Sequence, residues 1–447
     1  MKKSWIILAA LFIMSVVIAA QVAAQAATPE VSGTVRIGSF ESGDALNYWN
    51  AAISDYEAVN PNVKISLEAV PQDYGTKLLA ELASGTAPDI FQSGDGDVSK
   101  WVALGAAENL DPYINGSNPL DMSTLFPAVA SFGKVNGSYY YLTKDYSPLI
   151  VYYNKDLFQK AGVDAPTASW TEADMLKDAQ LLTIDANGNN ATSANFDPSN
   201  IKQWGIELPY TWDRAIEPII YANGGSIMAP DGSKFTGAFN SDATVAALQW
   251  YADLYTKYHI TPTNADVQSY SGTDMFQSGL VAMSWTGVWP MNGYKTVSGL
   301  NFGVVSLPSG SAGNANVLCW SGFGLYSGSQ NKDAAWDVLK FIAAGDGAKE
   351  FAKNGWTPVI SIAQAEGLDK DPLTADVVAD LANLKPIPDQ LNQYWADCGD
   401  HFFGTEFGPV LDNGASVKDA ADKFASEGDA CLADKMASAT AAATPSS

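Results

Sequence analysis

Residues 149–162 read L-I-V-Y-Y-N-K-D-L-F-Q-K-A-G, and this stretch decides the fold class. Its first five residues are apolar or aromatic, favour a buried strand and run into Asn154. Residues 155–160 have a helical pattern, and Gly162 follows where that helix would end. A buried strand, a one-residue turn and a short helix are typical of α/β proteins.

The N-terminal part of the chain alternates strands and helices. Residues 35–40 and 63–70 fit strands, and a third short strand begins near Pro88. The helix between the first two strands places four apolar residues on one face: Leu46, Trp49, Ile53 and Tyr56. Single helices between strands imply a parallel sheet with crossover connections, so the sequence predicts an α/β fold.

The N-terminus has the pattern of an export signal. Lys2 and Lys3 precede an apolar run over residues 5–20, and Ala24-Gln25-Ala26 supplies small residues at a cleavage site. A membrane anchor is the alternative, but the run is near the lower length limit for a spanning helix. No cysteine lies nearby to carry a lipid anchor. We therefore expect residues 1–26 to be removed, leaving a soluble periplasmic or extracellular protein without membrane insertion.

The net charge excludes two classes of binding partner, and the three cysteines allow one disulfide. The 447 residues include 25 basic and 49 acidic side chains, a formal net charge of −24 at pH 7. Such a surface repels nucleic acid and anionic lipid, so neither is expected as a partner. Cys319, Cys398 and Cys431 have no zinc-site spacing. One disulfide is expected in an oxidising compartment. Cys398 with Cys431 is our first choice because both lie in the C-terminal segment, although the other pairings stay open.

Several further segments occur in an order typical of one known family. They are residues 84–90 (S-G-T-A-P-D-I), 276–283 (F-Q-S-G-L-V-A-M), 287–289 (G-V-W), 332–342 and 355–358 (G-W-T-P). With residues 149–162, they resemble the bacterial extracellular solute-binding proteins of the sugar-binding, maltose-binding-protein-like family. Members of that family are the substrate-binding components of ABC transporters. The resemblance covers nearly the whole mature chain.

The resemblance implies a periplasmic-binding-protein-like α/β fold with two lobes, a ligand cleft and a multi-strand hinge. Lobe one would comprise residues 31–145 plus 319–350, and lobe two residues 146–316 plus 356–436. The chain would cross between the lobes near residues 145–147, 316–322 and 344–358. Residues 437–447 are rich in Ala, Thr and Ser, a composition that predicts a disordered tail.

The resemblance also implies a function. It implies a monomeric receptor that binds a sugar, expected to be an oligosaccharide, and delivers it to an ABC permease in the inner membrane by hinge closure. It implies no cofactor and no catalysis. A secreted carbohydrate-degrading enzyme is the alternative class, since two carboxylates suffice for glycoside hydrolysis. A receptor of the same fold for a non-sugar ligand, such as a polyamine or an oligopeptide, also stays open.

Sugar recognition needs flat aromatic side chains together with carboxylates, amides and guanidinium groups. Positions within the family segments, the loops after the first and third strands and the first crossing supply such groups. The candidate ligand-binding residues are Trp289, Trp212, Arg214, Asp95, Asp97, Glu41, Asp44, Ser147, Tyr74, Trp320 and Trp395.

Each of these residue types also has a structural role. A tryptophan is more often a core residue than a ligand platform. Asp95 and Asp97 suit turns and helix caps, and Tyr74 lies at helical spacing with two leucines. For a C-terminal stacking residue, Trp395 competes with residues 401–402.

One loop is comparable with calcium sites. Residues 185–189 read D-A-N-G-N, with oxygen-bearing side chains at alternate positions. Its glycine comes two places too early, and position twelve is Phe196 rather than glutamate. We therefore predict a hairpin turn of the Asn-Gly type and no metal site.

Overall fold

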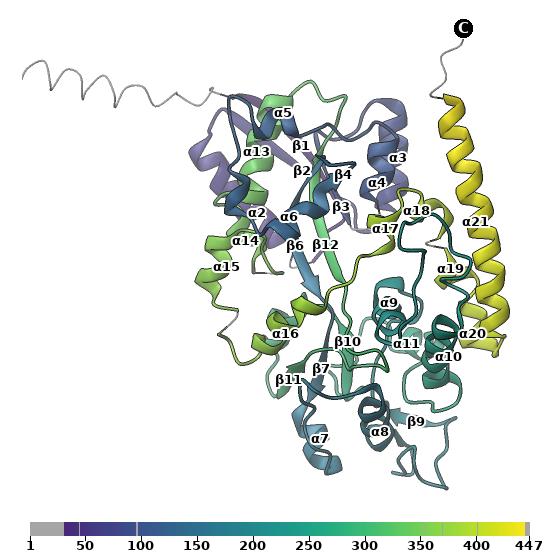
Figure 1. Ribbon diagram of the computed structural model, residues 1–447. Helices are drawn as coiled ribbons and strands as arrows, with labels where there is room; N and C mark the ends of the chain where they lie inside the picture. The colour runs from purple at the N-terminus through teal and green to yellow at the C-terminus, as the bar shows by residue number, and fades with distance from the viewer. Residues whose placement is uncertain are drawn as a thin grey trace, which may run out of the picture.

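The computed structural model describes residues 31–43, 45–94, 97–353, 355–368, 370–399 and 401–442. The predicted export signal, residues 1–26, lies outside these ranges, as do residues 443–447. The described chain forms a mixed α/β fold in which helices surround two principal sheets (Figure 1). The predicted α/β class is confirmed.

The larger sheet has five strands in the order β2-β1-β3-β12-β6. β1 (Gly33–Ser39) pairs in parallel with β2 (Val63–Ala69) and β3 (Ile90–Gly94). α2 (Ala45–Val59) and α3 (Tyr74–Ser84) make the predicted crossovers between them. β12 (Leu318–Leu325) arrives from far along the chain and pairs antiparallel with both β3 and β6 (Tyr141–Pro148). The sheet is therefore mixed.

Residues 149–162 form β7 (Ile150–Asn154) and α7 (Lys155–Ala161), as predicted. The Asn154 side chain accepts hydrogen bonds from the backbone N–H groups of Asp156 and Leu157, both at 3.1 Å, and Gly162 ends the helix with φ of 68°. β7 is the middle strand of a three-stranded sheet and pairs antiparallel with β10 (Met283–Thr286) and β11 (Phe302–Val305). The predicted parallel pairing therefore holds only for β1 to β3.

We call the elements around the five-stranded sheet lobe one and those around the three-stranded sheet lobe two. The other helices are α4 (Val98–Ala103), α5 (Asp111–Ile114), α6 (Pro127–Ala130), α8 (Glu172–Leu182), α9 (Asp213–Ala222), α10 (Asp242–Thr256), α11 (Asn264–Ser269), α12 (Met291–Thr296), α13 (Lys332–Ala344), α14 (Ala348–Phe351), α15 (Ile360–Glu366), α16 (Ala375–Asp380), α17 (Pro388–Leu391), α18 (Trp395–Cys398), α19 (Phe402–Thr405), α20 (Gly408–Asn413) and α21 (Val417–Ala442). Short strands are β4 (Lys134–Val135), β5 (Ser138–Tyr139), β8 (Ile184–Asp185) and β9 (Ile201–Gln203).

Each lobe has its own buried core. In lobe one, α2, α13 and α14 pack on the sheet around Trp49, Trp336 and Phe323. In lobe two, α7 to α10 and α18 to α21 enclose a larger core. A third buried cluster, which includes Tyr152 and Trp320, contains residues of both lobes. The exact division of the chain into lobes stays a prediction.

The chain passes three times between the two lobes. β6 leads through Leu149 into β7, and residues 306–317 lead from β11 to β12. The third passage lies later than the predicted range 344–358. Val359 still bridges Leu125 of lobe one, and the chain joins the lobe-two core at Ile387.

Asn316, which is 1% exposed, contacts all three passages. Its Oδ1 accepts the N–H of Leu149 at 3.1 Å, and its Nδ2 donates to the Leu149 carbonyl at 2.8 Å. Nδ2 also donates to Asp380 Oδ2 at 3.3 Å, and the Asn316 backbone bonds to Asn383 and Lys385. One buried side chain therefore connects the segments that join the lobes.

The last described helix, α21, runs along lobe two (yellow in Figure 1). Its Cys431 forms a disulfide with Cys398 of α18, with Cα atoms 5.6 Å apart, which confirms the preferred pairing. α21 also buries Phe424 and Leu432 in the core. The disordered tail predicted from residue 437 is wrong for residues 437–442, because this anchored helix continues through alanine-rich sequence to Ala442.

Candidate ligand-binding cleft

A cavity of about 480 Å³, the first cavity, lies where β1, β3 and β6 end. Ligand sites in α/β sheets usually lie outside the carboxyl ends of the strands. Lobe two contributes the loop that carries Val288 and Trp289. The lining residues are Phe40, Glu41, Ser42, Ala45, Gly94, Asp145, Tyr146, Ser147, Val288, Trp289, Cys319, Trp320, Ser321 and Gly355.

A buried lysine holds two carboxylates at this cavity. Lys144 Nζ lies 2.8 Å from Glu41 Oε1 and 2.6 Å from Asp145 Oδ2, and its side chain is 2% exposed. Gln92 Nε2 donates to Glu41 Oε1 at 3.1 Å, and Ser321 Oγ donates to Asp145 Oδ1 at 2.8 Å. Both carboxylates are therefore fixed in position, as a preorganised site requires.

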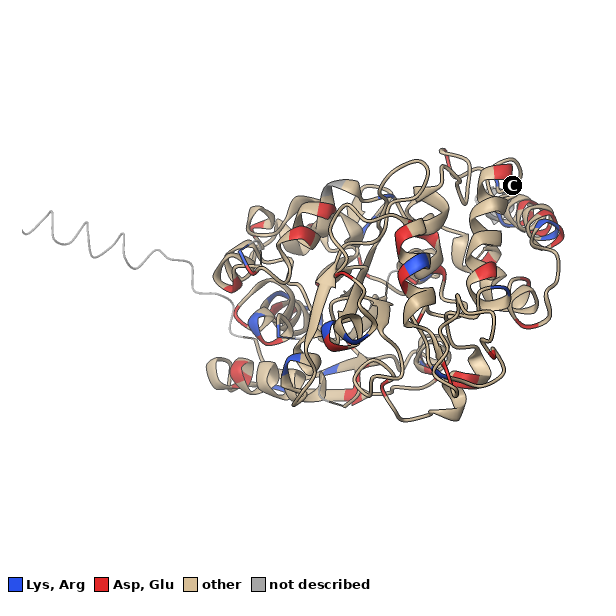
Figure 2. Cartoon of the chain, turned by 90° about the horizontal axis from the view of Figure 1, so that it is seen from below, with Lys and Arg blue, Asp and Glu red and all other residues tan. Residues whose placement is uncertain are grey.

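The charges of this cluster are mutually stabilising. Burial raises the pKa of Glu41, but the charge and hydrogen bonds of Lys144 lower it overall. Burial opposes the charged form of Lys144, but Asp145 and Glu41 raise its pKa overall. Elsewhere, acidic residues are spread over helices around the molecule and interspersed with basic ones (Figure 2). With two carboxylates facing one paired ammonium, the first cavity is a poor site for an anion.

Trp289 stands on a loop held by two hydrogen bonds. Ser147 Oγ accepts the N–H of Val288 at 2.8 Å, and Tyr152 Oη donates to the Gly287 carbonyl at 3.2 Å. The indole lies against Gly287, where an added Cβ would come within 1.9 Å of the ring, so a larger residue there would displace the indole. Trp289 is 39% exposed and lines the first cavity. It therefore presents an aromatic surface to a ligand.

Trp212 is not among the lining residues of the first cavity, but it contacts Trp289, which is. The two indole rings meet edge to face, with centroids 5.8 Å apart and an interplanar angle of 66°. Two residues further on, Arg214 is 2% exposed and forms ion pairs with Asp213 and Glu217. Arg214 is not among the lining residues of the first cavity, and its role in ligand binding stays a prediction.

Four of the predicted residues line the first cavity: Glu41, Ser147, Trp289 and Trp320. Trp320 is 6% exposed and stacks on Phe132, with centroids 5.9 Å apart and an interplanar angle of 19°. Trp395 is only 1% exposed and packs against Phe235. The prediction for Trp395 is corrected, since burial in the lobe-two core removes it from the cavity.

The remaining predicted residues lie beside the cavity or outside the described chain. Tyr74 packs edge to face on Phe40, with centroids 5.9 Å apart, and Phe40 in turn lines the cavity. Asp97 immediately precedes α4, where its Oδ1 lies 3.7 Å from Lys100 Nζ. Asp44 and Asp95 lie outside the residues that the structure describes.

Sequence reasoning misses several of the lining residues, of which Asp145 matters most. Asp145 and Tyr146 are expected only as part of a crossing, although Asp145 holds Lys144 at the cavity. A Lys-Asp pair inside an otherwise buried strand is the signal that could have found it. Gly355 had no such signal, because its approach to Asp145, 3.1 Å from an added Cβ, depends on the folded chain.

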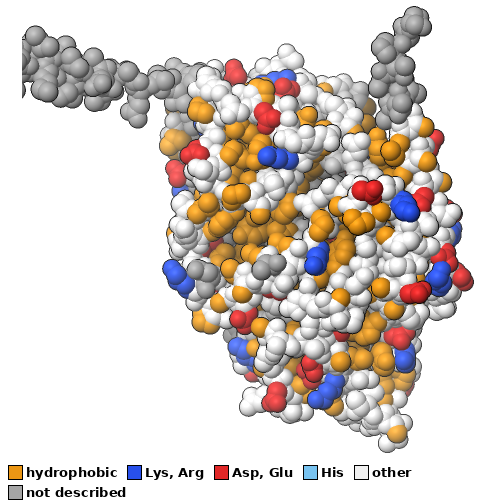
Figure 3. Space-filling model, in the orientation of Figure 1, with side chains coloured by type: hydrophobic (Ala, Val, Ile, Leu, Met, Phe, Trp, Pro, Cys, Tyr) orange, Lys and Arg blue, Asp and Glu red, His pale blue; other side chains and the backbone are white. Residues whose placement is uncertain are grey.

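A separate cavity of about 420 Å³ is mainly apolar and is lined by residues of the hinge strands β6 and β12 and of α6, α15 and α16. Its lining includes Phe126, Leu318, Trp356 and Leu381. Figure 3 shows hydrophobic side chains gathered on this face, over the region of α6, α15 and α16. The lining offers few partners for hydroxyl groups, so it does not suit a sugar.

The loop compared with calcium sites is organised by its own backbone. Asp185 Oδ1 accepts the N–H groups of Asn187 and Asn189 at 2.8 Å, and Oδ2 accepts from Asp197 N–H at 3.0 Å. Burial raises the pKa of Asp185, but these donors, with the Asn189 side chain, hold it at about 2. Gly188 has φ of 85° in the turn, as an Asn-Gly turn requires. Among the described residues, no three His, Cys, Asp or Glu side chains cluster as metal ligands would.

Known proteins are similar to this chain in sequence and in fold. Residues 51–397 match the family of bacterial extracellular solute-binding proteins. The maltotriose-binding protein of Pyrococcus abyssi is 25% identical over 74% of this chain and 67% of its own. The sn-glycerol-3-phosphate-binding periplasmic protein of Yersinia enterocolitica is 26% identical over 78% of each chain. An ABC substrate-binding protein from Listeria monocytogenes, solved with cycloalternan, is 26% identical with a TM-score of 0.77, over 91% of this chain and 99% of its own.

This chain belongs to the bacterial extracellular solute-binding protein family, a family of non-catalytic receptors related to the maltose- and oligosaccharide-binding components of ABC transporters. The suspected resemblance is thereby confirmed, and the alternative of a carbohydrate-degrading enzyme is set aside. Among the described helices, none is both long enough and apolar enough to cross a bilayer.

Proposed function

We propose that this protein is an exported, monomeric receptor that binds an oligosaccharide between its two lobes. By hinge closure it would present the ligand to an ABC import permease in the inner membrane. The observation that carries the proposal is the first cavity, where Trp289 and Trp320 stand beside Glu41 and Asp145. Aromatic surfaces suit the C–H faces of sugars, and fixed carboxylates accept hydrogen bonds from sugar hydroxyl groups.

We assign the ligand contacts by position. Trp289 would stack on a sugar ring, and its edge-to-face contact with Trp212 would hold the indole in place. Glu41 and Asp145 would accept hydroxyl hydrogen bonds, since Lys144 pairs with both carboxylates and orients them. Closure of lobe two would bring the Trp289 loop toward these groups. This assignment adds Asp145 to the predicted set and leaves out Trp395, which is buried in the lobe-two core.

Two other ligand classes provide contrasts. A glycerol-3-phosphate ligand, as in the Yersinia relative, would place a phosphate near two carboxylates. The same carboxylates would favour a polyamine, but Lys144 already neutralises part of their charge. A neutral sugar fits both the aromatic and the charged groups better than either.

A thermal-shift screen tests the proposal. Maltotriose and related oligosaccharides, glycerol-3-phosphate and spermidine would each be added to the full mature chain. A sugar at about one hundred times its Kd should add about 2.7 kcal/mol to the free energy of unfolding. Stabilisation by glycerol-3-phosphate or spermidine, with no response to any sugar, would contradict the assigned ligand class.

A further inference from the structure

A second cavity, of about 630 Å³, lies between the lobes. Lobe one supplies the residues around η2 (Ser131–Gly133) and β4, and lobe two supplies the segment from α17 to α18. Met436 of α21 completes it. Because both lobes line this cavity, its shape depends on how far they are closed.

One aromatic pair connects the linings of the two cavities. Trp320 lines the first cavity and Phe132 lines the second, and their rings stack with centroids 5.9 Å apart and an interplanar angle of 19°. Phe132 belongs to η2 and Trp320 to β12, so both rings are fixed on lobe one. The linings of the two cavities are therefore in contact through this stacked pair.

The lining of the second cavity suits neutral hydroxyl-bearing ligands. Hydroxyl and amide side chains predominate: Ser99, Ser131, Asn136, Gln390, Gln393 and Tyr394. Among the described residues that line it, none carries a carboxylate. Lys134 is its cation, and its ammonium lies 4.4 Å from the centre of the Tyr139 ring. Amides and hydroxyls both donate and accept hydrogen bonds, as sugar hydroxyls do.

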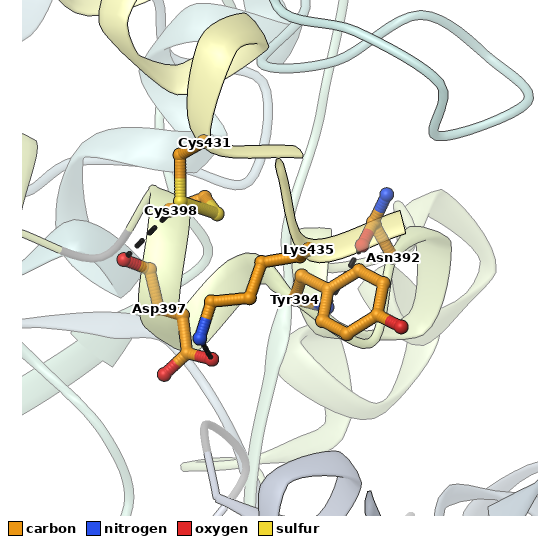
Figure 4. The surroundings of a disulfide bond; sticks show 6 residues. All are labelled: Asn392, Tyr394, Asp397, Cys398, Cys431 and Lys435. Carbon is orange, nitrogen blue, oxygen red and sulfur yellow. Dashed lines mark hydrogen bonds and ion pairs between the residues drawn. A yellow bond between two sulfur atoms is a disulfide. The ribbon is translucent and has the colours of Figure 1, made fainter. Parts of the chain in front are cut away.

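A disulfide clamps the lobe-two wall of this cavity (Figure 4). Cys398 of α18 is bonded to Cys431 of α21, and Lys435 Nζ lies 2.5 Å from Asp397 Oδ2. Just before α18, the Tyr394 N–H donates to Asn392 Oδ1 at 2.8 Å, and Asn392 Nδ2 donates to the Gly232 carbonyl at 2.7 Å. The segment that carries Gln393 and Tyr394 is therefore tied to lobe two at both ends.

We propose that the second cavity is an outer compartment of the ligand cleft, which binds the distal units of a single extended oligosaccharide. The Cys398–Cys431 disulfide positions its lobe-two wall. This inference rests on the proposed function, and it adds that the natural ligand is longer than the first cavity alone can hold. The first cavity supplies aromatic and carboxylate contacts common to short and long ligands, whereas the second adds contacts for long ones only.

A chain-length series tests the outer compartment. Malto-oligosaccharides and manno-oligosaccharides of one to seven units would be titrated calorimetrically into the full mature protein. Affinity should rise by about tenfold or more between two and six units, the equivalent of one or two added hydrogen bonds, at a stoichiometry of one. Equal affinity for short and long members, or two ligands per chain, would overturn the outer compartment. If neither series binds, the proposed function fails instead.

Variants locate the added contacts. Gln393→Ala and Tyr394→Ala should each weaken six-unit binding by about fivefold to tenfold, and should reduce the gain from two to six units. Gln330→Ala is the matched control, since Gln330 is exposed beyond the opposite end of β12. A full gain with length in both cavity variants would overturn the assignment.

A further variant separates the role of the disulfide from folding. Cys398→Ser combined with Cys431→Ser should lower the gain with chain length more than it lowers two-unit affinity, in protein that still melts cooperatively. If the pair serves stability only, Tm falls and the gain with length stays intact, which contradicts the positioning role. Should the double variant fail to fold, Lys435→Ala loosens the same contact through Asp397 and is measured in the same way.

Discussion

The hydroxyl of Ser147 accepts a hydrogen bond from the backbone N–H of Val288 at 2.8 Å. Ser147 lies at the end of a lobe-one strand, and Val288 belongs to the loop that presents Trp289 from lobe two. Ser147 Oγ also donates to the Pro148 carbonyl at 2.8 Å. A single side chain thus connects the hinge to the aromatic surface of the first cavity.

Ser147→Ala should weaken sugar binding and cost about 1–3 kcal/mol of stability, because it leaves the buried Val288 N–H without its acceptor. Ser329→Ala is a suitable control, since Ser329 is also buried and donates to Asp89 far from the cleft. Calorimetric titration and urea unfolding of both variants would separate the effects. Equal sugar affinity in the two variants would argue against the role of Ser147 in holding the loop.

Trp289→Ala should reduce sugar affinity by about thirtyfold, or about 2 kcal/mol, as truncation of a central aromatic contact typically does. Its stability should change little because the side chain is 39% exposed. Trp285→Ala is the contrast: this indole is 2% exposed, and its removal should cost about 3–5 kcal/mol of stability. A large loss of stability in Trp289→Ala with unchanged affinity would show that the ring serves packing instead.

Asn316→Ala should destabilise the protein by at least about 2 kcal/mol, because it removes partners from the buried backbone of Leu149 and from Asp380. It should also loosen the hinge, which small-angle scattering would report as a changed radius of gyration without ligand. The control is Asn115→Ala, an exposed residue whose side chain donates only to the carbonyl four residues back. Equal stability of the two variants would exclude a structural role for Asn316 at the hinge.

The ionisation of Glu207 should lower the free energy of unfolding as the pH rises from about 4.5 to 7. Burial, with the nearby charge of Asp274, raises the pKa of Glu207 to about 7. Between its ordinary pKa and this value the folded state binds more protons than the unfolded state, so stability decreases with rising pH. Glu207→Gln should therefore stabilise the protein at pH 7.5, by up to about 3 kcal/mol, and have little effect below pH 4.5. Thermal unfolding at both pH values tests this, with Glu427→Gln as an exposed control.

Local patterns predict the parts of the fold that depend on neighbours in sequence. Residues 149–162 form the expected strand and helix, because Asn154 and Gly162 act as the start and stop signals of α7. The antiparallel insertion of β12 and the late third passage depend on contacts between distant segments, which local periodicity does not encode. Trp395 shows the same limit at the site: the family resemblance makes it a candidate for the C-terminal stacking residue, but packing against Phe235 decides that it is core.

The position of β12 has a consequence for biosynthesis. β12 begins at Leu318 but lies between β3 and β6, which are complete by Pro148. A nascent chain that ends before Leu318 therefore leaves the facing edges of β3 and β6 unpaired. The lobe-two core can be completed only later still, because it includes Phe424 and Leu432. Neither lobe can complete its fold until late in translation, so we expect most of the growing chain to remain open enough to be threaded through a secretion channel.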